Sequence, residues 1–326
     1  MQGGNYKDNQ YKKIKLIGRG AFGSIKLCEN MLPKDSTCPA KFIALKKISM
    51  INPNDAKETT LQREIKILKE YPHPNIIKLY DTFTQKKDAN LVLEYMTCDL
   101  GAFIDKSGVK LASSDVKHIF REVLTGLKYL HENFILHRDM KTQNIMLGHD
   151  GKVKLIDFGL GKSFFFPINE TKIFLARTYG NPEEPMTLQV CTRWYKPPEV
   201  MFGQKHYDTS FDVWGCGCIL AEMFLGKAIF IGSTDIDMLT KIFEICGTPN
   251  DQNWPDANKL PYFMEFETMA PVSFKSLMPT APEEALDLLE QMLQLNPSYR
   301  ISLEKALQHP FLATLIKPEQ LTYLAY

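Results

Sequence analysis

The residues best suited to chemistry lie in two short segments near the middle of the chain. Residues 137–144 read His-Arg-Asp-Met-Lys-Thr-Gln-Asn, and residues 157–159 read Asp-Phe-Gly. Phosphoryl transfer needs one carboxylate that orients the attacking hydroxyl, and further oxygen ligands for the metal ions that neutralise the phosphates. Asp139 fits the first role, whereas Asn144 and Asp157 fit the second as ligands of Mg²⁺. The spacing therefore predicts phosphoryl transfer.

The pattern H-R-D-x-x-x-x-N followed by D-F-G resembles the catalytic and metal-binding loops of eukaryotic protein kinases. The resemblance extends from about Tyr11 to Leu312. It implies an α+β, bilobal fold with a β-rich small lobe and a mostly helical large lobe. The implied boundaries are an N-terminal extension at 1–10, the small lobe at 11–95, the large lobe at 96–312 with an activation segment at 157–199, and a C-terminal tail at 313–326.

A glycine motif near the N-terminus supports this interpretation. Residues 18–23 read Gly-Arg-Gly-Ala-Phe-Gly, but such a motif alone is weak evidence because dinucleotide-binding folds share it. Apolar residues precede and follow it, which predicts strand–turn–strand, whereas a Rossmann motif leads from a strand into a helix. Glycine lets the backbone close over phosphate oxygens. By the resemblance, the bound nucleotide is ATP, with Mg²⁺.

A lysine and a glutamate are expected to assemble the phosphate site. Lys46 ends the apolar run of residues 42–45, and the resemblance gives it contact with the α- and β-phosphates. Leu61, Ile65 and Leu68 recur at a helical spacing, which predicts a helix over about 58–68. Glu64 lies beside that apolar stripe and is the expected ion-pair partner of Lys46.

The rest of the nucleotide site follows from the resemblance. The backbone at Glu94 and Met96 is expected to bind adenine, with Leu93 behind the base, Met146 beneath it and Asp99 near the ribose. The expected ATP-binding residues are Ile17, Gly18, Gly20, Gly23, Ile25, Ala44, Lys46, Glu64, Leu93, Glu94, Met96, Asp99 and Met146.

Three residues are expected to act on the protein substrate. They are Asp139, Lys141 and Thr192, with the Thr192 side chain hydrogen-bonded near the other two and helping to select a Ser or Thr hydroxyl. Residues 192–199 resemble the substrate loop of cyclin-dependent and mitogen-activated kinases. Residues 134–137, 157–164 and the surroundings of Trp254 most resemble the CDK-activating branch of the cyclin-dependent kinases, while a cell-cycle-related kinase relative stays open.

The large lobe is expected to contain two structural signatures of the family. Asp212 should anchor the backbone of the catalytic loop, and Glu199 should form a buried ion pair with Arg300. Lys196 takes the place of an arginine that braces the pocket for a proline after the target residue. Lysine lacks the planar fork of arginine, and we still expect a preference for Ser/Thr-Pro sequences.

Regulation by phosphorylation is implied by position. Thr187 stands where cyclin-dependent kinases carry the activating phosphothreonine, and Arg63, Arg138 and Lys162 align with the cations that receive this phosphate. A phosphate group adds charge and acceptor oxygens that can order a loop against such cations.

Partner binding is expected at two places. A cyclin would dock on the helix that carries Glu64; our hypothesis is that this helix is mispositioned alone and that the cyclin sets the Lys46–Glu64 pair. The activation segment is long and contains an extra stretch over about 165–186. That stretch could pack locally, plug the active site or bind an assembly factor. Thr142, which replaces a customary proline, and Gly161 are expected to alter packing or backbone freedom only.

Composition excludes several other classes of protein. The 326 residues carry 39 basic and 38 acidic side chains, for a formal net charge of +1, which does not favour nucleic-acid binding. The start lacks a signal-peptide core, and the apolar stretch 213–231 contains Glu222 and Lys227, so a core helix is expected there rather than a membrane span. Seven cysteines form no C-x-x-C pair. A cytoplasmic or nuclear protein is expected.

Other functions fit less well. A pseudokinase scaffold is disfavoured because the residues expected to bind ATP and Mg²⁺ are all present. A lipid, small-molecule or tyrosine kinase is disfavoured because residues 192–199 are typical of kinases that bind extended peptides around Ser or Thr. The sequence thus predicts a protein serine/threonine kinase.

Overall fold

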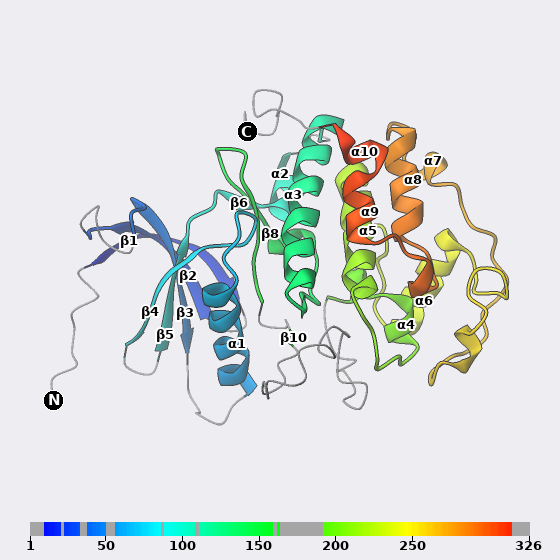
Figure 1. The fold of residues 1–326 in the computed structure, drawn as a ribbon, viewed down its shortest axis with the longest axis horizontal. Coiled ribbons are helices and arrows are strands. Elements are labelled where there is room, and N and C mark those ends of the chain that lie inside the picture. Colours follow the sequence, from blue (N-terminus) through cyan, green and yellow to red (C-terminus); the bar gives the residue numbers. More distant parts are fainter. Residues whose placement is uncertain are drawn as a thin grey trace, which may run out of the picture. The chain divides into compact units, whose positions relative to one another are not determined.

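The computed structural model describes residues 10–20, 23–32, 38–49, 56–85, 88–107, 111–158, 162–163 and 192–314. The chain divides into two compact units, Met1–Thr97 and Cys98–Tyr326. The first is rich in strands and the second in helices, which agrees with the predicted α+β class (Figure 1).

The first unit contains a five-stranded antiparallel sheet in the order β1-β2-β3-β5-β4. Its strands are β1 (Tyr11–Gly20), β2 (Gly23–Asn30), β3 (Phe42–Ser49), β4 (Leu79–Gln85) and β5 (Asp88–Glu94). The β1–β2 hairpin confirms the predicted strand–turn–strand at the glycine motif. A Cβ atom at Gly23 would lie 1.8 Å from the carbonyl oxygen of Lys47, so only glycine fits there.

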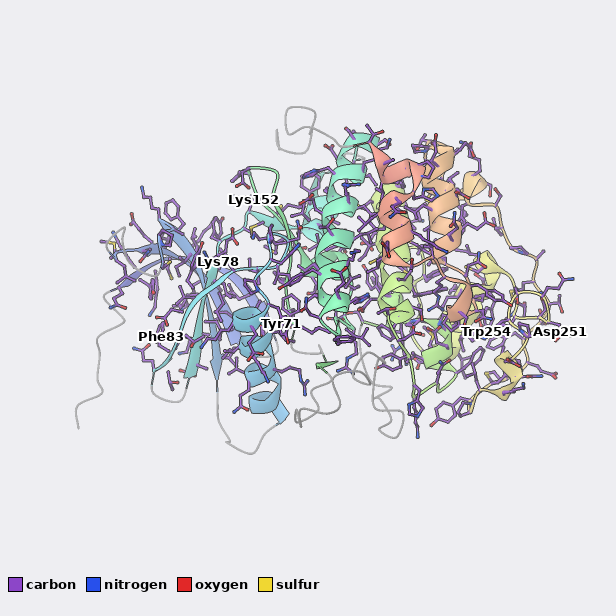
Figure 2. The ribbon with its side chains drawn as sticks, viewed as in Figure 1. Tyr71, Lys78, Phe83, Lys152, Asp251 and Trp254 are labelled. Atoms are coloured by element: carbon purple, nitrogen blue, oxygen red, sulfur yellow. The ribbon has the colours of Figure 1, made fainter. Side chains whose placement is uncertain are left out.

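A buried cluster under one face of this sheet includes Tyr11, Cys28, Ile43, Leu45 and Val92. Phe83 of β4, labelled in Figure 2, packs against it. Its ring stacks on that of Tyr11, with ring centroids 6.2 Å apart. The unit's helix, α1 (Ala56–Glu70), buries Leu61 and Leu68 of the predicted apolar stripe. The predicted helix is confirmed, and it begins and ends two residues beyond the predicted range.

The second unit begins with β6 (Cys98–Asp99), α2 (Leu100–Ser107) and α3 (Ser113–Glu132). Then come the short strands β7 (Ile135–Leu136), β8 (Ile145–Leu147), β9 (Val153–Leu155) and β10 (Lys162–Ser163), which form the sheets β6-β8-β9 and β10-β7. Two 3₁₀ turns matter for the site: η1 (Thr142–Asn144) and η2 (Arg193–Tyr195).

The remaining helices form most of the second unit. They are α4 (Pro198–Met201), α5 (Ser210–Leu225), α6 (Asp235–Cys246), α7 (Phe274–Leu277), α8 (Glu283–Met292), α9 (Leu303–Gln308) and α10 (Pro310–Ala313), with 3₁₀ turns η3 (Ala257–Lys259) and η4 (Pro297–Tyr299). Helix α5 is central, since every residue from Phe211 to Met223 is buried. It accounts for most of the apolar stretch 213–231, as predicted. Within the described part of the chain, no helix has the length and apolarity to cross a membrane.

Candidate active site

The catalytic loop connects β7 to β8, and its backbone is hydrogen-bonded to Asp212 of α5. The backbone N–H groups of His137 and Arg138 donate to the two oxygens of the Asp212 carboxylate at 2.9 and 2.8 Å. Asp212 is fully buried, and its Oδ2 oxygen also lies 2.8 Å from Nε2 of His131. Arg138 has a left-handed backbone conformation with φ 63°. Few residues other than glycine adopt this conformation, and these hydrogen bonds stabilise it. The predicted anchoring role of Asp212 is thus confirmed.

The Asp212 carboxyl is kept ionised by these partners. Burial alone would raise the pKa of Asp212. The hydrogen bond and charge of His131, the charge of His137 and the Arg138 N–H outweigh that effect and lower the pKa below its usual 3.8.

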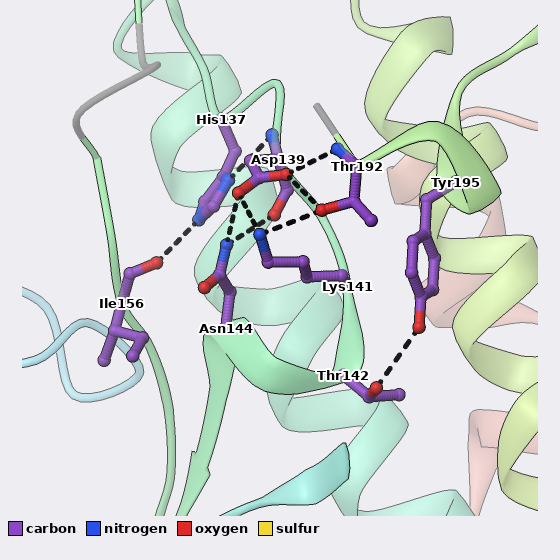
Figure 3. A network of polar contacts seen from close by, with 8 residues as sticks. All are labelled: His137, Asp139, Lys141, Thr142, Asn144, Ile156, Thr192 and Tyr195. Atoms are coloured by element: carbon purple, nitrogen blue, oxygen red, sulfur yellow. Dashed lines mark hydrogen bonds and ion pairs between the residues drawn. The ribbon is translucent and has the colours of Figure 1, made fainter. Parts of the chain in front are cut away.

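The side chain of Asp139 is the centre of a hydrogen-bonded network (Figure 3). Its Oδ2 oxygen accepts bonds from Lys141 Nζ at 2.5 Å and Asn144 Nδ2 at 3.0 Å. Its Oδ1 oxygen accepts the backbone N–H of Thr192 at 3.1 Å, and Lys141 Nζ also donates to Thr192 Oγ1 at 3.0 Å. The expected contacts of Thr192 with Asp139 and Lys141 are therefore present. The network fixes one carboxylate beside one ammonium group.

The two expected ligands of Mg²⁺ lie on adjacent, connected segments. Asn144 donates its amide N–H to the Asp139 carbonyl at 2.7 Å, which leaves its Oδ1 oxygen for a cation. The Ile156 N–H, next to Asp157, donates to the Asn144 carbonyl at 3.0 Å, and the Ile156 carbonyl is 3.1 Å from Nε2 of His137. No group of three or more acidic, His or Cys side chains able to hold a metal occurs among the described residues. One amide and one carboxylate fit Mg²⁺, which usually completes its shell with waters and substrate phosphates.

The first unit contains the predicted lysine–glutamate pair. Lys46 Nζ on β3 lies 2.7 and 2.9 Å from the two carboxylate oxygens of Glu64 on α1. The side chains are 19% and 6% exposed, respectively, so the pair is largely shielded from solvent. The pair itself is confirmed. Control of this pair by a cyclin stays a prediction.

The other expected nucleotide residues of the first unit lie on the sheet and just after it. Ala44, Leu93 and Met96 are buried, and Ile25 is half-buried. Ile17 remains 39% exposed, as a residue that covers a ligand would be. Gly18 pairs with Ile25, and Gly20 with Gly23.

The backbone of Glu94, expected to bind adenine, has a hydrogen bond to the preceding strand region. Its N–H donates to the Lys78 carbonyl at 2.9 Å, so this N–H is already engaged within the first unit.

Two expected nucleotide residues belong to the second unit. Met146 is half-buried on β8. The Oδ1 oxygen of Asp99 accepts the Ala102 N–H at 2.7 Å at the start of α2. Asp99 therefore has a structural use in addition to the expected ribose contact.

The structure shows the three cations expected to receive a phosphate in different detail. Arg138 is 4% exposed and its Nη1 lies 3.4 Å from the hydroxyl of Tyr207. Arg63 is half-buried on α1 of the first unit. Lys162 is described only in its backbone, which pairs with Leu136. Thr187 and the stretch 165–186 lie outside the described residues.

The segment that follows Thr192 is tied to the helices of the second unit. Glu199 and Arg300 form the predicted buried ion pair through two contacts of 2.7 and 2.6 Å. Lys196 Nζ donates to Asp235 Oδ2 at 2.7 Å, at the N-terminus of α6. Sequence reasoning did not predict this partner of Lys196.

Sequence reasoning also missed a buried hydrogen bond of Thr142. The Thr142 hydroxyl donates to the carboxylate of Glu222 at 3.0 Å, across 80 residues of sequence. Its only signal in the sequence was the departure from the customary proline, which we had expected to alter packing or backbone freedom alone.

Comparisons with known proteins agree with this geometry. Residues 11–312 match the protein kinase domain family. Cyclin-dependent kinase D-1 of Arabidopsis thaliana is 39% identical over 95% of this chain and 73% of its own length, and the protein of that name from Oryza sativa subsp. indica is 38% identical over 96% and 70%. A chain in the structure of the CAK complex of Chaetomium thermophilum bound to ATP-gamma-S superposes with a TM-score of 0.82 at 33% identity, covering 97% of this chain and 95% of that one.

Proposed function

The chain belongs to the protein kinase family, as a serine/threonine kinase of the cyclin-dependent type, and we propose that it phosphorylates Ser-Pro and Thr-Pro sequences in proteins with Mg²⁺ and ATP. The observation that carries this proposal is the network around Asp139. It combines a buried carboxylate, the Lys141 ammonium and the Thr192 hydroxyl within hydrogen-bonding distance of one another.

In the proposed reaction, Asp139 orients the Ser or Thr hydroxyl of the substrate and accepts its proton. Lys141 holds the carboxylate in place and would stabilise negative charge on the transferred phosphoryl group. Thr192, bonded to both residues, restricts the space for the substrate hydroxyl. Catalysis then depends on positioning and charge stabilisation by groups that are already in place.

The residues expected to form the nucleotide site are proposed to bind ATP. Lys46, oriented by Glu64, would contact the α- and β-phosphates, while the backbone of Glu94 and Met96 would bind adenine. Asn144 and Asp157 would hold Mg²⁺, which when bound neutralises phosphate charge. The buried sites of Ala44, Leu93 and Met96 suit the apolar faces of a base.

The direct test is steady-state transfer from ATP to a Ser-Pro peptide, compared between the wild-type chain and Asp139→Asn. The variant keeps the shape of the side chain but cannot accept the proton, so kcat should fall by about 100-fold or more. ATP affinity should be nearly unchanged. Nucleotide binding with no turnover by the wild-type chain under any condition would favour a scaffold role instead.

The proline preference is tested with matched peptides. Lys196 is engaged by Asp235, so it presents a point charge held at α6 where related kinases have an arginine. We expect kcat/KM to be at least about tenfold higher for Ser-Pro than for Ser-Ala, with Tyr-Pro not phosphorylated. Equal use of Ser-Pro and Ser-Ala would overturn the proposed preference without affecting kinase activity.

Regulation is proposed to involve a cyclin on α1 and a phosphate on Thr187. The similar solved structure is described as that of a CAK complex, which supports the idea that this chain also works in an assembly. An assembly factor at the activation segment is a further proposed partner. Adding candidate cyclins singly to the wild-type chain and to Thr187→Ala tests this. Full activity of the isolated, unphosphorylated chain would contradict it.

A further inference from the structure

Three buried polar side chains form a cluster beside the catalytic loop. Thr142, Tyr195 and Glu222 are 0%, 3% and 6% exposed and belong to η1, η2 and α5. The Tyr195 hydroxyl donates to Glu222 Oε2 at 2.6 Å, and the Thr142 hydroxyl donates to Glu222 Oε1 at 3.0 Å. The two hydroxyl oxygens are 3.3 Å apart, and Figure 3 shows these two side chains directed toward each other.

When Glu222 is ionised, both hydroxyl protons of this cluster are donated to its carboxylate. Each hydroxyl has one proton and gives it to one carboxylate oxygen, so both oxygens have a donor. Burial raises the pKa of Glu222 above its usual 4.5, and the bonds from Tyr195 and Thr142 oppose that rise. Removing either hydroxyl would leave a buried carboxylate oxygen with one donor fewer, which is costly in a protein interior.

Helix α2 closes the space around Thr142. A Cβ atom at Gly101 would lie 3.0 Å from Thr142 Oγ1 and 2.9 Å from Gln143 Nε2. This close approach shields the Thr142 hydroxyl from solvent. The small threonine side chain fits in this confined space, and its hydroxyl still reaches Glu222.

The cluster joins the two segments that meet at the active site. Thr142 directly follows Lys141, whose Nζ contacts Thr192, and Tyr195 follows Thr192 by one 3₁₀ turn. The catalytic loop and the substrate segment are thus connected twice, once through Lys141 and Thr192 and once through the Glu222 carboxylate, which accepts from both Thr142 and Tyr195. Glu222 fixes the second connection to the central helix α5.

We propose that Thr142 is a positioning residue that sets the substrate segment 192–196 relative to Asp139, through its hydrogen bond to Glu222, which also accepts the hydroxyl of Tyr195. Proline, the residue expected at this position from the kinase resemblance, has no hydroxyl and could not make this connection. The proposal rests on the proposed function, because it assigns to Asp139 the carboxylate against which the substrate is aligned. Misplacement by about 1 Å at a reacting centre can lower the rate about 100-fold.

The test compares Thr142→Val, which keeps the shape but removes the hydroxyl, with Thr142→Ser, which keeps the hydroxyl. Both are measured in the assembly that gives wild-type activity. We expect kcat/KM for a Ser-Pro peptide to fall about tenfold or more in Thr142→Val and to stay within about threefold of wild type in Thr142→Ser. The KM for ATP should change less than about twofold in both. Tyr195→Phe should resemble Thr142→Val, and the double variant should be less impaired than the product of the two effects.

Three outcomes would overturn the proposal: wild-type kcat/KM in Thr142→Val, equal losses in the Val and Ser variants, or a rise in the KM for ATP as large as that for the peptide. If Thr142→Val does not fold, the Tyr195→Phe enzyme decides by the same criteria. Peptide affinity of the Asp139→Asn chain, with and without Thr142→Val, keeps the two proposals distinguishable. A peptide Kd weakened about tenfold by Thr142→Val supports the positioning role even if Asp139 proves not to be the catalytic carboxylate, and an unchanged Kd counts against it.

Discussion

At the scale of single residues, Asp212 shows how one buried carboxylate can hold a catalytic loop. It accepts the N–H groups of His137 and Arg138 and pairs with His131. We expect Asp212→Asn to lower the free energy of unfolding by about 3 kcal/mol at pH 7, because an amide cannot accept all of these bonds. Urea unfolding measures this. Asp208→Asn is a matched control, since Asp208 is exposed and asparagine can still accept the Ser210 N–H.

The pH dependence of this contribution has a definite sign. A carboxyl whose pKa is lower in the folded chain stabilises the fold at pH values above its unfolded pKa, here the usual 3.8, and loses that effect as the pH falls through the lowered folded value. The difference between wild type and Asp212→Asn should therefore persist from pH 7 to pH 5 and begin to shrink only below about 3.8. A difference that already shrinks between pH 7 and pH 5 would contradict this account.

Long-range contacts could be predicted only where the family resemblance supplied them, as for Glu199 and Arg300. Asp139, Lys141 and Asn144 lie within one motif, so their proximity follows from the local chain. The bond from Thr142 to Glu222 spans 80 residues, and that from Lys196 to Asp235 spans 39. Such pairs depend on how α5 and α6 pack, which no periodicity in the sequence specifies.

At the scale of elements, two glycines allow α5 to pack closely against neighbouring segments. A Cβ atom at Gly215 would lie 2.9 Å from Cβ of Met140 in the catalytic loop, and one at Gly217 would lie 2.7 Å from Cδ2 of Leu293. Alanine usually stabilises a helix by about 1 kcal/mol relative to glycine. We expect both Gly→Ala variants to lower the free energy of unfolding instead, by about 1–3 kcal/mol, because their sites are already filled.

Activity should separate the two glycine variants. Gly215→Ala pushes on Met140, which lies between Asp139 and Lys141, so kcat should fall about tenfold. Gly217→Ala pushes on the flexible end of the Leu293 side chain, away from the loop, so kcat should stay within about twofold of wild type. Kinetics of both variants at a temperature where they are folded check this, and equal kcat values would refute a role of Gly215 in placing the loop.

Helices with one strong apolar face were predictable, because burial follows the 3.6-residue period. The helix predicted over 58–68 is α1, and the core helix expected in the apolar stretch 213–231 is α5. Short strands such as β6 and β7 were not predicted, since two residues carry no periodicity.

At the scale of the whole molecule, the two units divide the proposed work. The first contains Lys46, which would bind ATP phosphates and is oriented by Glu64, and the second contains Asp139, which would act on the substrate hydroxyl. The strand-rich and helix-rich composition of the units followed from the family resemblance. Mutating Lys46 should therefore affect mainly nucleotide binding, and mutating Asp139 mainly phosphate transfer.

Thermal unfolding with and without ATP and Mg²⁺ tests this separation. A ligand at about 100 times its Kd stabilises the folded state by about 2.7 kcal/mol, which for a chain of this size raises Tm by about 4 °C. We expect Lys46→Met to lose most of this shift, because it removes the ammonium that would contact the phosphates and takes its positive charge away from the Glu64 carboxylate. Asp139→Asn should keep the shift while losing kcat. Loss of the shift in both variants would show that nucleotide binding and catalysis are not divided between the units in this way.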